Sequence, residues 1–137
     1  KTHTTIYFDT LIEPAEDTKA VSGTTPPSKG NKRTIAEMQY EIMSKYPYKF
    51  TSDDVLFQIY ADRHDLAKSE YKKAREQFFS KGQACLRTSP LAKTYGFGIH
   101  SDSEGRVAPY GMETEKFQSL QSDRKIKKVK ALRSSRK

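Results

Sequence analysis

The side chains best suited to chemistry gather between residues 80 and 111, a stretch that holds the single cysteine and one of three histidines. Ser89 precedes Pro90, and a Ser-Pro pair is typical of a helix N-cap followed by the first helical residue. A helix N-terminus leaves N–H groups unpaired, and a nearby arginine can hold a phosphate or carboxylate with two hydrogen bonds. The spacing therefore predicts a site for a small anionic ligand within residues 85–110. Its predicted contacts are Arg87, Ser89, Lys93 and His100.

The same residues have a second interpretation that is purely structural. In it, Ser89 only caps a short helix and Arg87 pairs with an acid on the surface. Gly98 and His100 alternate on one face of a predicted strand, so His100 would stand beside the space that the missing side chain leaves. That space could be an open pocket with His100 in its wall, or it could be filled by an aromatic ring packed across the glycine.

Cys85, His100 and Asp102 supply the residue types of a thiol nucleophile, its base and the carboxylate that orients the base. Only the types match, because Asp102 falls in a predicted hairpin loop. A lone cysteine that follows a helix is usually a small buried hydrophobic residue. A cysteine-dependent enzyme using Cys85 and His100 is therefore one of three open hypotheses, and the sequence does not decide whether the protein is an enzyme.

Metal or cofactor binding is not predicted. A metal ion needs three or four convergent ligands, and no pair among the three histidines and the cysteine has ligand spacing. The acidic pair Asp53-Asp54 is better explained as the first turn of a helix, where the helix dipole favours negative charge. No cofactor motif accompanies these residues.

The net charge of +8 arises entirely in residues 124–137, because every acidic residue of the chain precedes them. The body up to residue 123 is neutral. A basic segment of this kind can neutralise nucleic-acid phosphates or bind an acidic partner, although no nucleic-acid fold signature accompanies it. The residues predicted for this role are Lys125, Lys127, Lys128, Lys130, Arg133 and Arg136.

Apolar residues interrupt the basic segment at intervals of three, at Ile126, Val129 and Leu132. This interval is closer to the helical period than to the strand period. We therefore expect residues 124–137 to dock on the body through one apolar face, with the lysines on the solvated face. The apolar side is thin and lacks an aromatic residue, so binding to a membrane surface is not predicted.

The expected elements define an α+β fold, a small antiparallel sheet packed against three to four helices. The sheet combines an N-terminal strand with a hairpin from the C-terminal half, and Pro109 marks the second hairpin arm as an edge. Two helices begin at T-x-x-E and T-x-x-D capping boxes, and Gly82 is expected to end the third. The predicted ranges are strands 4–13, 97–101 and 106–110, and helices starting at 34 and 51 and covering 67–81, 90–96 and 113–121.

Length and composition predict one domain, residues 1–137, with its own core. The longest wholly apolar run is far too short to cross a bilayer, and no signal-peptide pattern is present. One cysteine excludes an internal disulfide and favours a reducing compartment, so a cytoplasmic protein is expected. No particular oligomeric state is predicted.

The chain resembles a family of short, single-domain, mostly bacterial proteins that are uncharacterised. The likeness is carried by the stretches YKFTSDDVLF at 48–57, FFSKGQACLRTSPL at 78–91, YGFGIHS at 95–101 and KKVKA at 127–131. Phe97 departs from the tryptophan expected there. The resemblance implies no activity and no catalytic residue. It does imply that the basic segment belongs to the domain.

Overall fold

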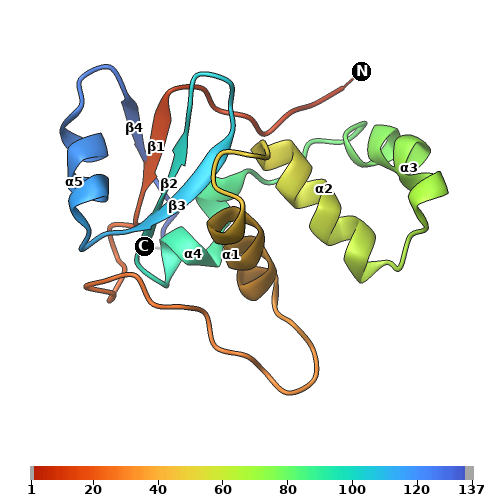
Figure 1. The fold of residues 1–137 in the computed structure, drawn as a ribbon, viewed down its shortest axis with the longest axis horizontal. Coiled ribbons are helices and arrows are strands. Elements are labelled where there is room, and N and C mark those ends of the chain that lie inside the picture. The colour runs from red at the N-terminus through yellow and green to blue at the C-terminus, as the bar shows by residue number, and fades with distance from the viewer. Residues whose placement is uncertain (1, 135–137) are drawn as a thin grey trace.

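Residues 2–134 are described by a computed structural model, in which four strands form one sheet in the order β3-β2-β1-β4 (Figure 1). β1 is antiparallel to β2, and β2 is antiparallel to β3, whereas β4 lies parallel to β1. The α+β class is confirmed, but the sheet is mixed rather than wholly antiparallel. The strands are β1 (Thr10–Glu13), β2 (Phe97–Ser101), β3 (Val107–Gly111) and β4 (Lys127–Lys130).

The helices divide between the two faces of the sheet. α5 covers one face, α1 and α4 cover the other, α2 packs on α1, and α3 lies beyond α2 (Figure 1). No helix within residues 2–134 is long and apolar enough to span a membrane. The helices are α1 (Ile35–Lys45), α2 (Ser52–Arg63), α3 (Tyr71–Phe78), α4 (Pro90–Lys93) and α5 (Glu115–Ser122), with short 3₁₀ turns η1 (Lys68–Glu70) and η2 (Leu86–Thr88).

Both faces of the sheet carry buried side chains. Successive residues of a strand point to opposite sides, so neighbours on one strand enter different hydrophobic clusters. On β1, Leu11 packs against Phe117 and Leu120 of α5. Its neighbour Ile12 belongs to the larger cluster on the other face, with the core of α1, α2 and α4. Ile99 in β2 is wholly buried within that cluster. Burial of large aliphatic side chains on both sides supplies most of the stability of such a sheet.

The predicted capping boxes are confirmed at α1 and α2. Thr34 Oγ1 accepts a hydrogen bond from Glu37 N at 3.1 Å, and the Glu37 side chain accepts one from Thr34 N at 3.0 Å. Thr51 and Asp54 repeat this exchange at 3.1 Å in both directions. These reciprocal bonds satisfy the free N–H groups of the first turn, which is why the two helix starts could be read from local sequence.

The third helix is shorter than predicted. The region expected to be one helix over 67–81 is a 3₁₀ turn, η1, followed by α3, which ends at Phe78. The prediction that Gly82 ends the helix is wrong, because Phe79 is the C-cap residue and has a φ of −90°. Phe79 is buried against Phe57 of α2, and this packing turns the chain away from the helix axis.

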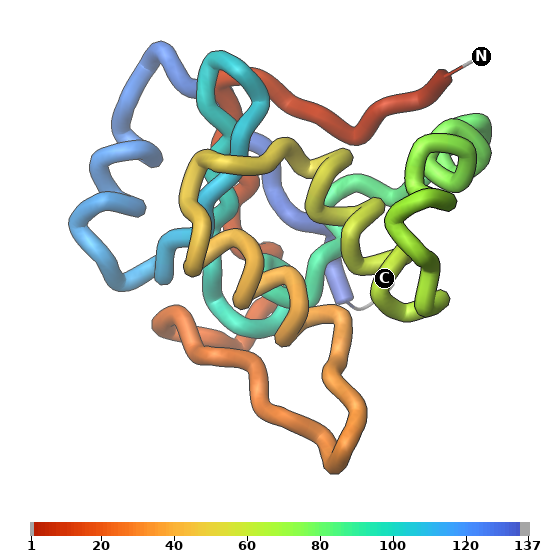
Figure 2. Tube along the Cα trace, turned by 45° about the vertical axis from the view of Figure 1, so that its right-hand side comes forward, coloured from red at the N-terminus to blue at the C-terminus, as the bar shows by residue number. Residues whose placement is uncertain are grey.

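β1 is also shorter than the predicted strand 4–13. Asp9 has a left-handed φ of 47°, which interrupts the extended chain before Thr10. The residues before it cross the start of α2 instead (Figure 2). Thr5 N donates to Asp53 Oδ1 at 2.8 Å. The alternating segment 4–13 therefore packs on two different elements, first on helix α2 and then, from Thr10, in the sheet.

The helix expected for the basic segment is wrong, because residues 127–130 form β4. Lys127 N donates to Asp9 O and Ala131 N donates to Glu13 O, both at 2.8 Å. An interval of three places strand residues on opposite faces. Ile126 packs with the cluster under α5, and Val129 packs with the cluster on the other face. The spacing that imitates a helix therefore fits a strand buried on both faces. Arg136 lies outside the described residues.

Candidate functional site

Ser89 is a buried helix cap, at the wall of a pocket of about 580 Å³. It is 2% exposed, and its Oγ accepts from Leu91 N at 3.1 Å, as expected for the N-cap of α4. The same hydroxyl donates to Gln39 Oε1 of α1 at 2.5 Å. This bond joins α4 to α1 and occupies the hydroxyl within the fold. Lys93 is the last residue of α4.

Arg87 holds the C-terminal end of β4 through hydrogen bonds. Its Nε donates to Lys130 O at 2.7 Å, and its carbonyl accepts from Leu132 N at 2.9 Å. The positive charge of Arg87 also acts on Tyr7, where it lowers the pKa of the hydroxyl and partly offsets the effect of burial. Arg87 is thus bound on both its side chain and its main chain by the segment 130–132.

Cys85 and His100 are not brought together. Cys85 Sγ lies 3.5 Å from Tyr7 Oη, on the side of the sheet that carries the larger cluster. Burial, and then the neighbouring thiol, raise the pKa of Tyr7. Asp102 Oδ1 accepts from Glu104 N and Arg106 N, both at 2.9 Å, and so shapes the β2–β3 turn. The three residue types of the predicted nucleophilic triad have separate partners.

His100 lies on the opposite face and ends a chain of hydroxyl hydrogen bonds. Tyr110 donates to Tyr48 Oη at 3.0 Å, and Tyr48 Oη lies 2.8 Å from His100 Nδ1. The Tyr48 hydroxyl accepts from Tyr110 and either donates to Nδ1 or accepts from it, depending on the tautomer of the imidazole. Burial, and then the charge of Lys116, lower the pKa of His100. The space beside Gly98 is filled by Phe117, whose ring lies 2.4 Å from an ideal Cβ at that position.

The lowered pKa of His100 predicts a loss of stability on mild acidification. The unfolded chain takes up a proton near the ordinary histidine pKa of 6.5, whereas the folded protein resists protonation until lower pH. The free energy of unfolding should therefore fall as pH drops below about 6.5. Urea unfolding between about pH 8 and pH 5 measures this slope. We expect a shallower slope in His100→Gln, and an unchanged slope would contradict this assignment.

A pocket of about 600 Å³ opens between the end of α1, the middle of α2 and α3. None of the predicted ligand residues lies in it. Most of its surface is apolar, although several lining side chains also carry a polar or charged group. It is lined by Ile42, Tyr46, Phe50, Asp54, Phe57, Gln58, Tyr71, Lys72 and Arg75.

The turn between α1 and α2 builds one wall of this pocket. Tyr48 has a left-handed φ of 61°, and its N–H donates to Val107 O of β3 at 2.9 Å. This conformation sends Tyr48 to the sheet, while Tyr46 and Phe50 line the pocket with ring centres 6.0 Å apart. The opposite wall is Phe57, which meets Tyr71 of α3 edge-on at 5.6 Å. Aromatic side chains on three helical segments therefore surround an apolar space.

Basic side chains lie in the pocket lining and against its aromatic walls. Lys49 Nζ stands 5.0 Å from the ring centre of Tyr46 and 5.4 Å from that of Phe50, and Lys45 Nζ is 5.6 Å from Tyr46. The Arg75 guanidinium lies 5.8 Å from the ring centre of Phe57. Lys72 adds a further charge from α3.

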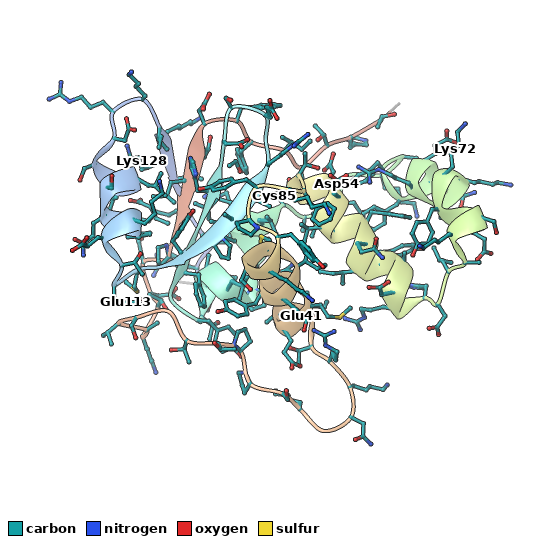
Figure 3. The ribbon with its side chains drawn as sticks, viewed as in Figure 1. Glu41, Asp54, Lys72, Cys85, Glu113 and Lys128 are labelled. Atoms are coloured by element: carbon teal, nitrogen blue, oxygen red, sulfur yellow. The ribbon has the colours of Figure 1, made fainter. Side chains whose placement is uncertain are left out.

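The acid in the pocket lining is already engaged. Asp54 pairs through Oδ1 with Arg75 at 2.9 Å, and its Oδ2 accepts from Thr51 N. Figure 3 shows Asp54 at the start of α2 and Lys72 on α3. Because the charges of Asp54 and Arg75 cancel, the lining residues keep one net positive charge, that of Lys72.

Sequence reasoning missed this pocket because its walls come from three helical segments that meet only in the folded protein. One signal was available in α2. Val55, Leu56, Ile59 and Tyr60 form an apolar stripe, and Phe57 lies outside it. Apolar residues around the whole circumference indicate a helix that is packed on more than one side. Phe57 indeed packs toward α3, away from the sheet.

Comparison with known proteins identifies a family but no activity. Neither a curated protein nor a solved structure matches the chain. A family model described as a family of unknown function, DUF6157, matches residues 2–137. This match agrees with the resemblance carried by the motifs at 48–57 and 78–91. The chain belongs to the DUF6157 family of unknown function.

Proposed function

We propose that the protein binds a small amphipathic anion, a molecule with an apolar body and a carboxylate or phosphate head, in the pocket between α1, α2 and α3. The observation that carries the proposal is an aromatic-walled space lined by Lys72 and Arg75, with Lys49 against the rings of Tyr46 and Phe50 that form one wall. Small-molecule sites are concave and mostly apolar, with a few polar groups that fix the orientation of the ligand. The positive rim selects a negatively charged head.

The proposed ligand is still a small anion, as expected from the sequence, but its site lies between α1, α2 and α3 instead of within residues 85–110. An anion bound by Arg87 and Ser89 has less support, because both side chains are engaged within the fold. A cysteine-dependent activity has less support for the same reason, since Cys85 faces Tyr7 rather than His100. A free cysteine suits a reducing compartment, and cytoplasmic location is part of the proposal.

Calorimetric titration with decanoate, kept below its micelle concentration, tests the proposal. Decanoate should bind more tightly than decanol, and decylammonium should bind least. Lys72→Glu should weaken decanoate binding roughly tenfold, which corresponds to about 1.4 kcal/mol. Lys73→Glu is the matched control, because Lys73 is the exposed neighbour on α3 and does not line the pocket. Its affinity should stay within about twofold of that of the unmodified protein.

Two results would reject this function. One is equal decanoate affinity in the Lys72 and Lys73 variants, which would mean that any binding occurs elsewhere. The other is tighter binding of decylammonium than of decanoate, which would mean that the aromatic walls and Asp54 select a cation instead.

A further inference from the structure

β4 is an outer strand of the sheet, and half of its backbone groups point away from β1. In a parallel pair, alternate residues direct N–H and C=O toward the neighbouring strand. Lys127 and Ala131 donate to β1, so Lys128 and Lys130 direct their backbone groups outward. Within residues 2–134, no hydrogen bond engages the N–H groups of Lys128 and Lys130.

The two edges of the sheet differ in how they are closed. The β3 edge carries Pro109 and is covered by the α1–α2 turn, where Val107 N donates to Phe50 O at 2.9 Å and Val107 O accepts from Tyr48 N. At the start of the β4 edge, Lys128 Nζ donates to Ile126 O, and within residues 2–134 a second side chain covers the edge at its C-terminal end. There the Arg87 side chain bonds to Lys130 O. Between Ile126 O and Lys130 O, no hydrogen bond from residues 2–134 engages the outward N–H groups of β4.

The open edge is positively charged. Arg124, Lys125, Lys127 and Arg133 are exposed on and beside β4, and no acid follows Asp123 in the chain. Two basic side chains are already bound locally: Lys128 Nζ donates to the carbonyls of Asp123 and Ile126, and Lys130 Nζ lies 3.7 Å from Glu13. Within residues 2–134, no ion pair engages Arg124, Lys125, Lys127 or Arg133, so their charges can meet an external acid.

We propose that the β4 edge accepts an extended acidic segment of a partner protein as an additional strand. The outward N–H groups of Lys128 and Lys130 supply main-chain hydrogen bonds, and the exposed cations select acidic side chains. Lysines on an edge strand oppose pairing with a second copy of the same edge, because like charges would meet. The same charge attracts an acidic strand, so one feature excludes self-association and recruits the partner.

The site is separate from the proposed ligand pocket. Lys72 at the pocket and Lys128 at the edge lie at opposite ends of the long axis of the molecule (Figure 3). Failure of decanoate binding therefore has no bearing on the β4 edge, and the reverse is also true.

Nitrogen-15 NMR titration of the full chain with a short peptide of alternating glutamate and valine tests the proposal. The amide signals of residues 126–130 should shift, and the amides of Lys128 and Lys130 should gain protection from hydrogen exchange. A peptide of alternating lysine and valine should cause neither effect. Absence of protection at Lys128 and Lys130 during the glutamate titration would overturn the proposal without any variant.

A pair of variants separates strand addition from simple charge attraction. Lys128→Pro removes an outward N–H, and Lys128→Gln keeps it while losing the same charge and side-chain bonds. Peptide affinity should fall roughly tenfold in the proline variant relative to the glutamine variant. Equal affinities would contradict strand addition. Binding of a single-stranded DNA oligonucleotide in place of the acidic peptide would show that the edge serves nucleic acid instead.

Discussion

Replacing Asp53 with alanine is expected to lower the free energy of unfolding by about 3 kcal/mol, because it removes a buried acceptor that serves several donors. Asp53 is 7% exposed. Its carboxylate accepts from Thr5 N at 2.8 Å and from the hydroxyls of Thr5 and Thr4, both at 2.7 Å. Without it, the Thr5 amide and hydroxyl are buried and lose charge-assisted hydrogen bonds. Urea unfolding measures the difference.

Asp62→Ala provides the matched control on the same helix. Asp62 is exposed and accepts from Gln58 Nε2 at 2.9 Å, so its loss should change the unfolding free energy by less than about 0.5 kcal/mol. Asp53→Asn, which keeps one acceptor oxygen, should fall between the two. Hydrogen exchange at the Thr5 amide should quicken in Asp53→Ala. Equal stability of the Asp53 and Asp62 variants would mean that the N-terminal segment contributes nothing to folding.

Gly98→Val is the second large expected effect. An ideal Cβ at Gly98 lies 2.4 Å and 2.7 Å from two carbons of the Phe117 ring. The added side chain would push α5 off the central strand β2, at a cost of about 3 kcal/mol from overpacking. Thermal and urea unfolding should both show the loss.

A second substitution distinguishes a clash with the Phe117 ring from a general intolerance of β2 to any side chain at position 98. Phe117→Ala alone leaves a cavity and should cost about 3 kcal/mol. The double variant Gly98→Val with Phe117→Ala should lose less unfolding free energy than the two single losses add up to. The difference should be at least about 1 kcal/mol, because valine occupies part of the space that the ring leaves. Gly82→Val is the control, since the nearest atom to its ideal Cβ is 4.0 Å away. Strict additivity in the double variant would contradict the packing described here.

The sequence predicted the features that depend on residues close together in the chain, such as helix caps and the hairpin turn. The capping boxes at Thr34 and Thr51 and the cap at Ser89 exchange hydrogen bonds with residues two or three positions away, and each was predicted correctly. The β2–β3 hairpin closes through Asp102, which bonds within its own turn. Such features need no knowledge of the rest of the fold.

What could not be predicted depends on distant partners. Ser89 and Arg87 look free in the sequence, and only the fold shows that Gln39 and Lys130 occupy them. The spacing of Ile126 and Val129 predicted a helix, and only pairing with β1 shows that it belongs to a strand buried on both faces. The pocket depends on three helical segments meeting, and no single segment carries that information.

The pairing of β1 has a consequence for the order of folding. Thr10 pairs with Ser101 and with Lys127, so its strand has no neighbour until most of the chain has been synthesised. The helices α1 to α3 depend on short-range bonds and can form earlier, whereas pairing between distant segments is slow. Leu11 and Ile12, almost completely buried in the finished sheet, stay open to solvent during that interval. They are the surface through which a nascent chain would aggregate or meet a chaperone.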